Sequence, residues 1–223
     1  MVRRSWGLFA VLLVVSSPAF AAPFQLDMGQ VGGPVQSGWT AIDLTGSYAG
    51  ANPFNLGGGV TAAFYSTNYT QDRTRSTVSP LNGLGYDDVL IDFIRFDNPS
   101  SDLEHSFQVK GLADGQYNVT VYSFDGDYGQ AYTYAPNVNG TVLGFGPPVS
   151  GNIDTARATA LITLSGGAAN NVITIYDSTT PVDQQRGLLL SGLVIDPVAI
   201  PEPATLALLG LGASALFLRR RKA

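Results

Sequence analysis

The sequence predicts an all-β fold: a two-sheet antiparallel β-sandwich, with an apolar helix at each end of the chain. Three observations favour this fold. Short runs of apolar or alternating residues recur at close intervals, separated by Gly, Asn, Asp and Pro. The acidic residues between positions 23 and 200 are fifteen Asp and a single Glu, and Asp favours turns over helices. No segment of useful length between the two ends has the period of an amphipathic helix.

Ten segments have the length and composition of strands. In one of them Tyr117, Val119 and Val121 share a face while Asn118 and Thr120 point the other way, as expected for a sheet with one face in the core. In chain order the segments are Phe24–Met28, Trp39–Asp43, Val60–Tyr65, Val89–Phe96, Ser106–Lys110, Tyr117–Phe124, Val138–Phe145, Ala158–Leu164, Val172–Asp177 and Gly187–Asp196. Strands at this spacing favour a sandwich of two sheets.

The connections between these strands are of two kinds. Asp114-Gly115 and Asn139-Gly140 predict tight hairpin turns, because these residue types accept a positive φ at low cost. The loops Gly46–Gly59 and Thr67–Gly85 are long and rich in Gly, Ser, Thr and Asn. Loops of that length are usually either functional or loosely ordered.

Composition excludes several classes of function. Residues 23–200 carry six basic and sixteen acidic groups, a net charge of −10, which excludes nucleic acid as a partner. The sequence has no cysteine, so disulfides, thiolate catalysis and Cys-ligated metals are excluded. The single histidine, His105, cannot build a His-based metal site alone. No G-x-S-x-G motif offers it a nucleophile to activate.

The first 22 residues predict a secretory signal peptide. Arg3 and Arg4 form a positive n-region, Trp6–Val15 forms an apolar h-region, and Ala19 and Ala21 form an A-x-A cleavage site. The sandwich domain is expected to span residues 23–199, outside the inner membrane.

The C-terminal residues 200–223 predict a transmembrane helix with a cationic stop. Ala204–Leu218 contains no charge, and as a helix it spans roughly 22 Å, somewhat less than the ~30 Å hydrocarbon core. The cations after it are expected to stay in the cytoplasm. The flanking residues are Pro201, Glu202 and Pro203 before the run, and Arg219, Arg220, Arg221 and Lys222 after it.

A Pro-Glu-Pro turn, an apolar helix and a cationic cluster follow one another at the C-terminal end of the sequence. This order resembles the PEP-CTERM sorting signal of Gram-negative bacteria. The resemblance covers residues 201–223. It implies that an exosortase recognises the Pro-Glu-Pro region and removes the tail, which releases the protein or re-anchors it at the cell surface. Before processing, the helix anchors the protein in the inner membrane. Proteins of this kind are associated with extracellular polysaccharide and biofilm matrix.

A second resemblance covers most of the domain between the two terminal segments. The residues that carry it are Phe24–Gly29 (FQLDMG), Pro34–Thr40 (PVQSGWT), Asp87–Phe93 (DDVLIDF), Asp114–Tyr122 (DGQYNVTVY) and Leu190–Asp196 (LSGLVID). They are similar to galactose-binding-like β-sandwich modules of jelly-roll type, which occur beside polysaccharide-degrading domains. Ile91 stands where that family's pattern has Arg, so no polar role is carried over to this position.

Asp125 and Asp127, with Tyr128 beside them, form a candidate calcium or ligand loop. The two carboxylates follow a strand and are two positions apart, a spacing that suits calcium. The loop is not an EF-hand, because Pro136 stands where the bidentate Glu is needed. A simple Asp/Gly turn is the alternative.

Asp87, Asp88 and Asp92 form a second acidic group. A glycosidase needs two carboxyl groups about 5–9 Å apart across the sugar. Nothing in the sequence places this group opposite Asp125 or Asp127. A solvated loop before a strand is therefore the expected role of these three residues.

Loop tyrosines are the candidate sugar-stacking residues, because their rings can pack on sugar C–H surfaces while their hydroxyls form hydrogen bonds. The alternative is burial in the core. Trp39, at the start of a strand, is expected to be a core anchor. The candidates are Tyr69, Tyr86, Tyr132 and Tyr134, and Tyr48, Phe54 and Tyr128 occupy similar positions.

Together these observations predict an exported, exosortase-sorted protein of the cell surface or extracellular matrix. Its sandwich is expected to be non-catalytic and to bind extracellular polysaccharide, with no cofactor other than an optional calcium ion. The alternatives are an enzyme that acts on polysaccharide through its Asp clusters, and a purely structural surface protein without a defined ligand.

Overall fold

The computed structural model describes residues 22–30, 32–44, 53–65, 70–74, 81, 83–96, 106–124, 136–145, 149–177 and 189–199. The chain divides into two compact units, residues 22–198 and the terminal segments 1–21 with 199–223. The expected signal helix and transmembrane helix therefore lie outside the described residues. Within the described ranges, no helix has the length and apolar character needed to cross a membrane.

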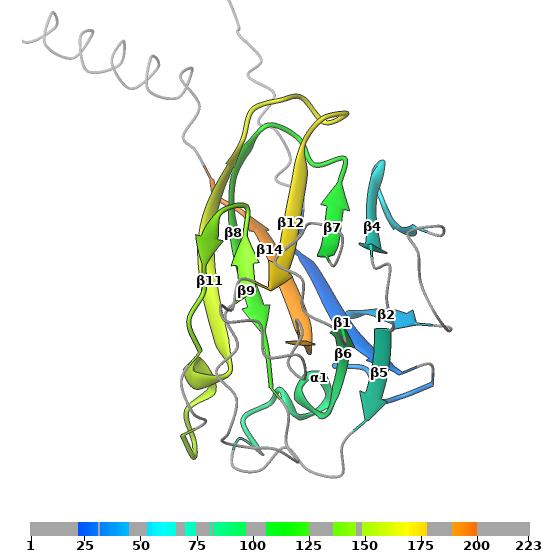
Figure 1. The fold of residues 1–223 in the computed structure, drawn as a ribbon, viewed down its shortest axis with the longest axis vertical. Coiled ribbons are helices and arrows are strands. Elements are labelled where there is room, and N and C mark those ends of the chain that lie inside the picture. The colour runs from blue at the N-terminus through cyan, green and yellow to red at the C-terminus, as the bar shows by residue number, and fades with distance from the viewer. Residues whose placement is uncertain are drawn as a thin grey trace, which may run out of the picture. The chain divides into compact units, whose positions relative to one another are not determined.

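Unit 22–198 consists of β-strands in three sheets, with very little helix in the described residues (Figure 1). The predicted all-β class is thus confirmed. The first large sheet has five strands, in the order β11 (Arg157–Leu164), β8 (Gly115–Tyr122), β14 (Gly192–Pro197), β1 (Phe24–Gln30) and β2 (Thr40–Leu44). The second has six, in the order β10 (Thr141–Val142), β9 (Pro136–Val138), β12 (Val172–Asp177), β7 (Ser106–Lys110), β4 (Val60–Tyr65) and β3 (Phe54–Gly57).

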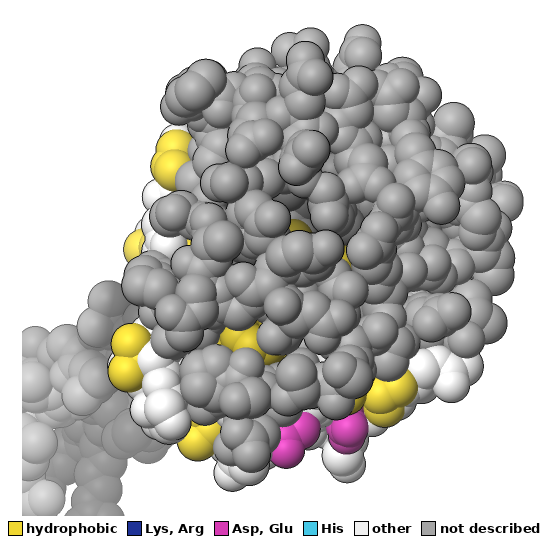
Figure 2. Space-filling view, turned by 60° about the horizontal axis from the view of Figure 1, so that its bottom comes forward, with side chains coloured by type: hydrophobic (Ala, Val, Ile, Leu, Met, Phe, Trp, Pro, Cys, Tyr) yellow, Lys and Arg dark blue, Asp and Glu magenta, His cyan; other side chains and the backbone are white. Residues whose placement is uncertain are grey.

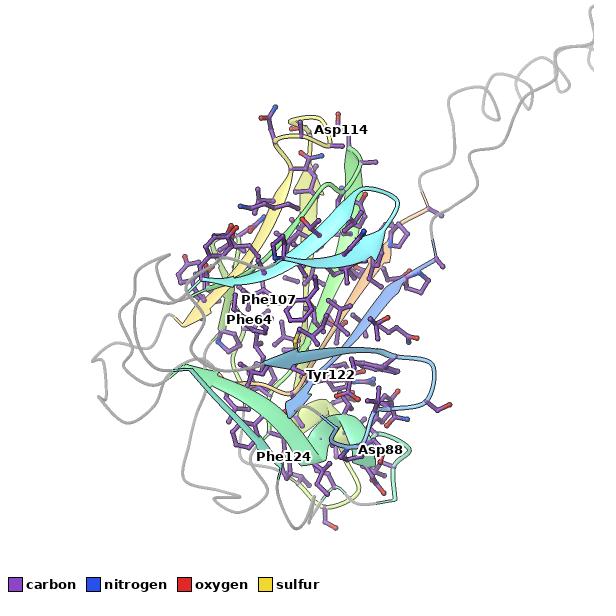
Figure 3. The ribbon with its side chains drawn as sticks, turned by 90° about the vertical axis from the view of Figure 1, so that its right-hand side faces the viewer. Phe64, Asp88, Phe107, Asp114, Tyr122 and Phe124 are labelled. Atoms are coloured by element: carbon purple, nitrogen blue, oxygen red, sulfur yellow. The ribbon has the colours of Figure 1, made fainter. Side chains whose placement is uncertain are left out.

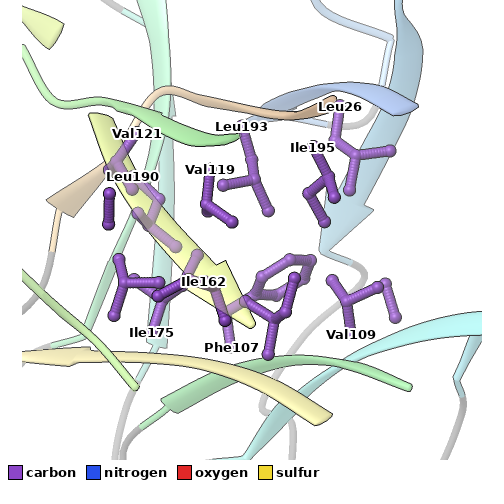
Figure 4. Close-up of a cluster of buried hydrophobic side chains, with 14 of the residues drawn as sticks. Leu26, Phe107, Val109, Val119, Val121, Ile162, Ile175, Leu190, Leu193 and Ile195 are labelled. Carbon is purple, nitrogen blue, oxygen red and sulfur yellow. The ribbon is translucent and has the colours of Figure 1, made fainter. Parts of the chain in front are cut away.

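The two large sheets enclose one hydrophobic core. Because side chains alternate along a strand, Val119 of β8 and Leu193 and Ile195 of β14 point inward from the first sheet. They meet Phe107 and Val109 of β7, and all five are fully buried (Figure 4). The same alternation leaves the other face of the five-stranded sheet free for different contacts.

A third sheet of three strands lies at one end of the sandwich, beside a short helix (Figures 1 and 3). Its strands are β13 (Leu189–Leu190), β6 (Asp92–Phe96) and β5 (Thr70–Thr74), and the helix is α1 (Asp87–Ile91). The sequence did not predict this sheet, because β5 lies in a segment that reads as a loop.

The predicted strand Val89–Phe96 is wrong in its first half, where the chain forms α1. The carbonyl oxygen of Tyr86 accepts a hydrogen bond from Leu90 N at 3.0 Å. Both carboxylate oxygens of Asp87 accept from Gly83 N, at 2.9 and 3.0 Å, which fixes the turn before the helix. The strand therefore begins only at Asp92.

The sandwich is not wholly antiparallel, because β1 and β2 pair in parallel, from Leu26↔Thr40 to Gln30↔Leu44. A parallel pair needs a crossover instead of a hairpin. Here residues 32–39 cross the outer face of the sheet. Asp27 holds this crossover, since its Oδ2 accepts a hydrogen bond from Gln36 N at 2.6 Å.

The two predicted hairpin turns have different outcomes. Asn139 and Gly140 have φ values of 47° and 92° and join β9 to β10, as predicted. Asp114-Gly115 does not form a hairpin, because the flanking strands β7 and β8 belong to different sheets. The Asp114 carboxylate instead accepts hydrogen bonds from Gly167 N at 2.8 Å and Asn171 Nδ2 at 2.9 Å.

Asn171 joins two loops at this end of the sandwich, where Figure 3 labels Asp114. Its Nδ2 also donates to Leu112 O at 2.9 Å, its Oδ1 accepts from Gly166 N at 2.9 Å, and its side chain is buried.

We predict that Asn171→Ala lowers the free energy of unfolding by about 2–4 kcal/mol, because these buried groups lose their partners. Urea unfolding measures the loss.

The matched control is Asn170→Ala. Asn170 is exposed, and its side chain makes one hydrogen bond among the described residues, from Nδ2 to Gly166 O at 2.9 Å. We expect a loss of no more than about 0.5 kcal/mol for this variant. Equal losses for the two variants would show that the burial of Asn171 has no special role.

Candidate functional site

A groove of about 730 Å³ lies on the outer face of the five-stranded sheet. Outward-pointing side chains of β1, β8, β11 and β14 form its floor, and residues 36–39 and 85–86 form its rim. Figure 3 shows Tyr122, which lines the groove, on the same side of the molecule as Asp88. The lining residues are Gln25, Gln36, Ser37, Trp39, Gly85, Tyr86, Thr120, Tyr122, Asp154, Arg157, Ala158, Thr159 and Val194.

Three aromatic rings meet in the groove. The Trp39 and Tyr122 rings pack edge to face, with centroids 5.4 Å apart and planes at 77°. The Tyr86 and Tyr122 rings lie 5.6 Å apart and are tilted by 30°. Tyr122 is buried, whereas Trp39 and Tyr86 are half-buried and keep part of their surface in the groove. Tyr122 therefore supports the other two rings.

A glycine makes room for Trp39. A Cβ on Gly192 of β14 would approach Trp39 Cζ3 to 2.9 Å and would overlap with Val89 Cγ2 of α1. The backbone also fixes the tryptophan, because Trp39 N donates to Gln36 O at 2.9 Å. Any side chain at position 192 would therefore displace the groove's largest ring.

Arg157 is the cation of the groove. Its Nε and Nη2 lie 2.9 and 2.8 Å from Asp154 Oδ1, and its Nη1 lies 3.5 Å from Tyr122 Oη. The guanidinium also faces the Tyr86 ring, with Cζ 5.8 Å from the centroid. The hydrogen bond with Tyr122, followed by that with Asp154, raises the pKa of Arg157 despite partial burial. Arg157 therefore stays charged, and Asp154 neutralises it.

Small polar groups complete the floor. The hydroxyls of Thr120 and Thr159, on neighbouring strands, lie 2.8 Å apart and share a hydrogen bond. The Oε1 atom of Gln36 is buried and has no hydrogen-bond partner among the described residues. A bound molecule with hydroxyl groups would find both donors and acceptors here.

Of the predicted sugar-stacking residues, Tyr86 lies in the groove. Trp39 packs against a hydrophobic cluster as expected, but it also lines the groove, which the sequence did not predict. The other predicted site residues lie outside the described residues: Tyr69, Tyr132, Tyr134, Asp125, Asp127, Tyr128, the cleavage residues Ala19 and Ala21, and the sorting residues Pro201, Glu202, Pro203, Arg219, Arg220 and Arg221.

Sequence reasoning missed Tyr122, Arg157 and Asp154. A signal for Tyr122 was present, because the alternation that puts Val119 and Val121 in the core puts Tyr122 on the opposite face. Asp154 and Arg157 have the i, i+3 spacing of an ion pair, but nothing in the sequence places them beside Tyr86.

Asp87 and Asp88 of the predicted acidic group do not line the groove. Asp87 binds Gly83 N, and Asp88 is exposed on α1. Across the described ranges, no group of three or more His, Asp or Glu residues could hold a metal ion. The candidate calcium loop stays a prediction, because it lies outside these ranges.

Burial first, and then the neighbouring Tyr86, raises the pKa of Tyr122, although Arg157 opposes the rise. Above about pH 10, Tyr122 ionises in the unfolded chain while the folded protein retains the proton. The free energy of unfolding should therefore fall as the pH rises beyond this value.

We predict that Tyr122→Phe loses less stability than the wild type between pH 8 and pH 11 in urea unfolding. Equal losses of unfolding free energy in the two proteins would contradict a raised pKa of Tyr122 in the folded protein.

Comparisons with known proteins give one sequence motif and several similar structures. The PEP-CTERM protein-sorting motif matches residues 199–222. No curated protein matches the chain. Among solved structures, the YXIM protein of Bacillus subtilis is similar with a TM-score of 0.53 and 16% identity, over 80% of this chain and 40% of that chain. The chain thus spans about two fifths of that relative, and the likeness shows a shared fold.

Two further structures are similar at lower scores. A calcium-binding mutant of β-glucuronidase 2 from Bacteroides uniformis has a TM-score of 0.47 and 12% identity, over 80% of this chain and 18% of that one. A family 35 carbohydrate binding module from Clostridium thermocellum has a TM-score of 0.30 and 13% identity, over 61% of this chain and 98% of that one. Apart from these likenesses, the PEP-CTERM motif at residues 199–222 implies an exported protein that an exosortase processes.

Proposed function

We propose that this surface-sorted protein binds extracellular polysaccharide, without catalysis, in the groove of the five-stranded sheet. The observation that carries the proposal is the pair of half-buried rings, Trp39 and Tyr86, facing the groove beside hydroxyl and amide groups. Sugars present C–H faces that pack on such rings, and hydroxyls that hydrogen-bond to polar neighbours. The sorting motif supports the proposal, since it implies export to the cell surface.

The charge of the groove favours neutral sugars. Arg157 is its cation, and Asp154 already pairs with it at 2.8 Å. The surrounding domain carries a net charge of −10, which repels polyanions. Figure 2 shows acidic side chains among the described residues of one face of this domain. We therefore expect neutral polysaccharides to bind better than uronate-rich ones.

A binding role accounts for the groove better than glycoside hydrolysis. Hydrolysis needs two carboxyl groups facing each other across the sugar. Asp154 is the one carboxylate among the described residues of the groove, and Arg157 holds it. This ion pair supports a role in positioning Arg157 rather than in proton transfer.

A glycan array probed with the purified protein tests the proposal. We predict binding to neutral polysaccharides and an affinity loss of roughly tenfold, about 1.4 kcal/mol, for Trp39→Ala and for Tyr86→Ala. Each variant removes a ring face that the sugar contacts. The matched control, Tyr176→Ala, removes a half-buried tyrosine from the other large sheet and should bind as the wild type does. A blank array with the folded wild type would instead favour a structural role without a ligand.

The sorting motif gives a separate prediction about location. Deletion of residues 201–223 should leave export intact but abolish surface sorting, because the exosortase then has no motif to recognise. Fractionation of cells into membrane, surface and medium measures the distribution of the protein. Trp39→Ala, which keeps the tail, should sort normally. Normal surface display of the truncated chain would contradict a role of the tail in sorting.

A further inference from the structure

The free edges of the two large sheets differ in how well they resist pairing with another chain. An exposed edge strand attracts other strands unless it is short, bulged or charged. In the described residues, β10 has two residues, β2 has five, and β3 shifts register between Asn55 and Gly57. The fourth edge, β11, has eight residues in unbroken register with β8, from Arg157↔Tyr122 to Leu164↔Gly115.

One side of β11 pairs with no described strand, and the main-chain groups there are regularly spaced. Ser123 N donates to Ala156 O at 2.9 Å, so Ala156 directs its carbonyl toward β8. Main-chain groups of successive residues point to opposite sides of a strand. The N–H and C=O groups of Thr159, Leu161 and Thr163 therefore point away from β8, toward the free edge.

The side chains of this edge also suit a partner. Leu161 is 58% exposed, an unusual position for leucine, between the exposed Thr159 and Thr163. Residues 155–176 contain no acidic residue, although the domain has a net charge of −10. Two copies of so acidic a domain repel each other, and a strand without acidic residues adds nothing to that repulsion.

We propose that β11 pairs antiparallel with β11 of a second copy of this chain, centred on Leu161. In this register Leu161 lies opposite its counterpart and Thr159 lies opposite Thr163 of the second copy. Apolar pairs and Thr–Thr pairs both stabilise antiparallel strands. The two five-stranded sheets become continuous, and the two-fold symmetry closes the assembly as a dimer.

The pairing also places the two grooves. A two-fold axis perpendicular to the joined sheet keeps both outer faces on the same side. Arg157 and Thr159 of β11 line the groove, so the two grooves flank the junction. Dimerisation itself does not depend on what the grooves bind.

Cysteine cross-linking tests the pairing in the full-length chain, purified in detergent from a host without an exosortase. The sequence has no cysteine, so Leu161→Cys introduces a unique thiol. Opposed residues of a hydrogen-bonded antiparallel pair have Cα atoms about 5.5 Å apart, within the range for disulfides. We expect a disulfide-linked dimer on mild oxidation. The matched control is Val142→Cys, at 56% exposure on the edge of the other large sheet, which keeps the β11 junction but should form no disulfide-linked dimer.

Light scattering gives a second measurement that needs no oxidation. The wild type should be dimeric, and Leu161→Lys should raise the dissociation constant by about tenfold or more, because like charges then face each other across the junction. Val142→Lys should leave it unchanged. A monomeric wild type, an assembly larger than a dimer, or equal cross-linking of the two cysteine variants would each overturn the proposal.

Discussion

The buried carboxylate of Asp27 is the constraint on which both the fold and the groove depend. Asp27 lies on β1 between two core residues, Leu26 and Met28, so its side chain points to the outer face. It is 2% exposed there. A carboxylate in such a place is costly unless hydrogen bonds compensate it. The short bond from Gln36 N supplies one, and it holds residues 32–39 across the sheet.

This crossover determines what the outer face becomes. The outer face of a sandwich sheet is often open to solvent. Here a second hydrophobic cluster, formed by Val89, Leu90, Tyr122 and other buried residues, covers part of it, and Trp39 packs against this cluster. The groove is the uncovered part between this cluster and the edge strand β11. Gly192 affects both the cluster and the groove. Because it has no side chain, α1 of the cluster and Trp39 of the groove can both approach the sheet at this point.

The sequence predicts the features that depend on local pattern. The alternation in Tyr117–Phe124 and Ala158–Leu164 locates two neighbouring strands to within two residues, and it identifies the face that enters the core. Features set by contacts distant in sequence were not predictable. The parallel pairing of β1 with β2 depends on the crossover that Asp27 holds, and the third sheet depends on pairing across a long separation. The groove is of the second kind, since its aromatic and charged groups come from four separate segments.

Among the described residues, the groove and β11 both lack unpaired carboxylates for the same reason, which lies in the sequence around β11. Along the stretch from Thr155 to Tyr176 the sequence has no acid, and Asp154, just before it, is held by Arg157. The described lining of the groove and the strand β11 thus carry no unpaired carboxylate, which suits contact both with a neutral polymer and with a second domain. Two grooves on one face of a dimer would bind a long polysaccharide more tightly than either groove alone, because the second binding event is intramolecular. Weak individual contacts, from two rings and a few hydroxyls, are then sufficient for retention in a matrix.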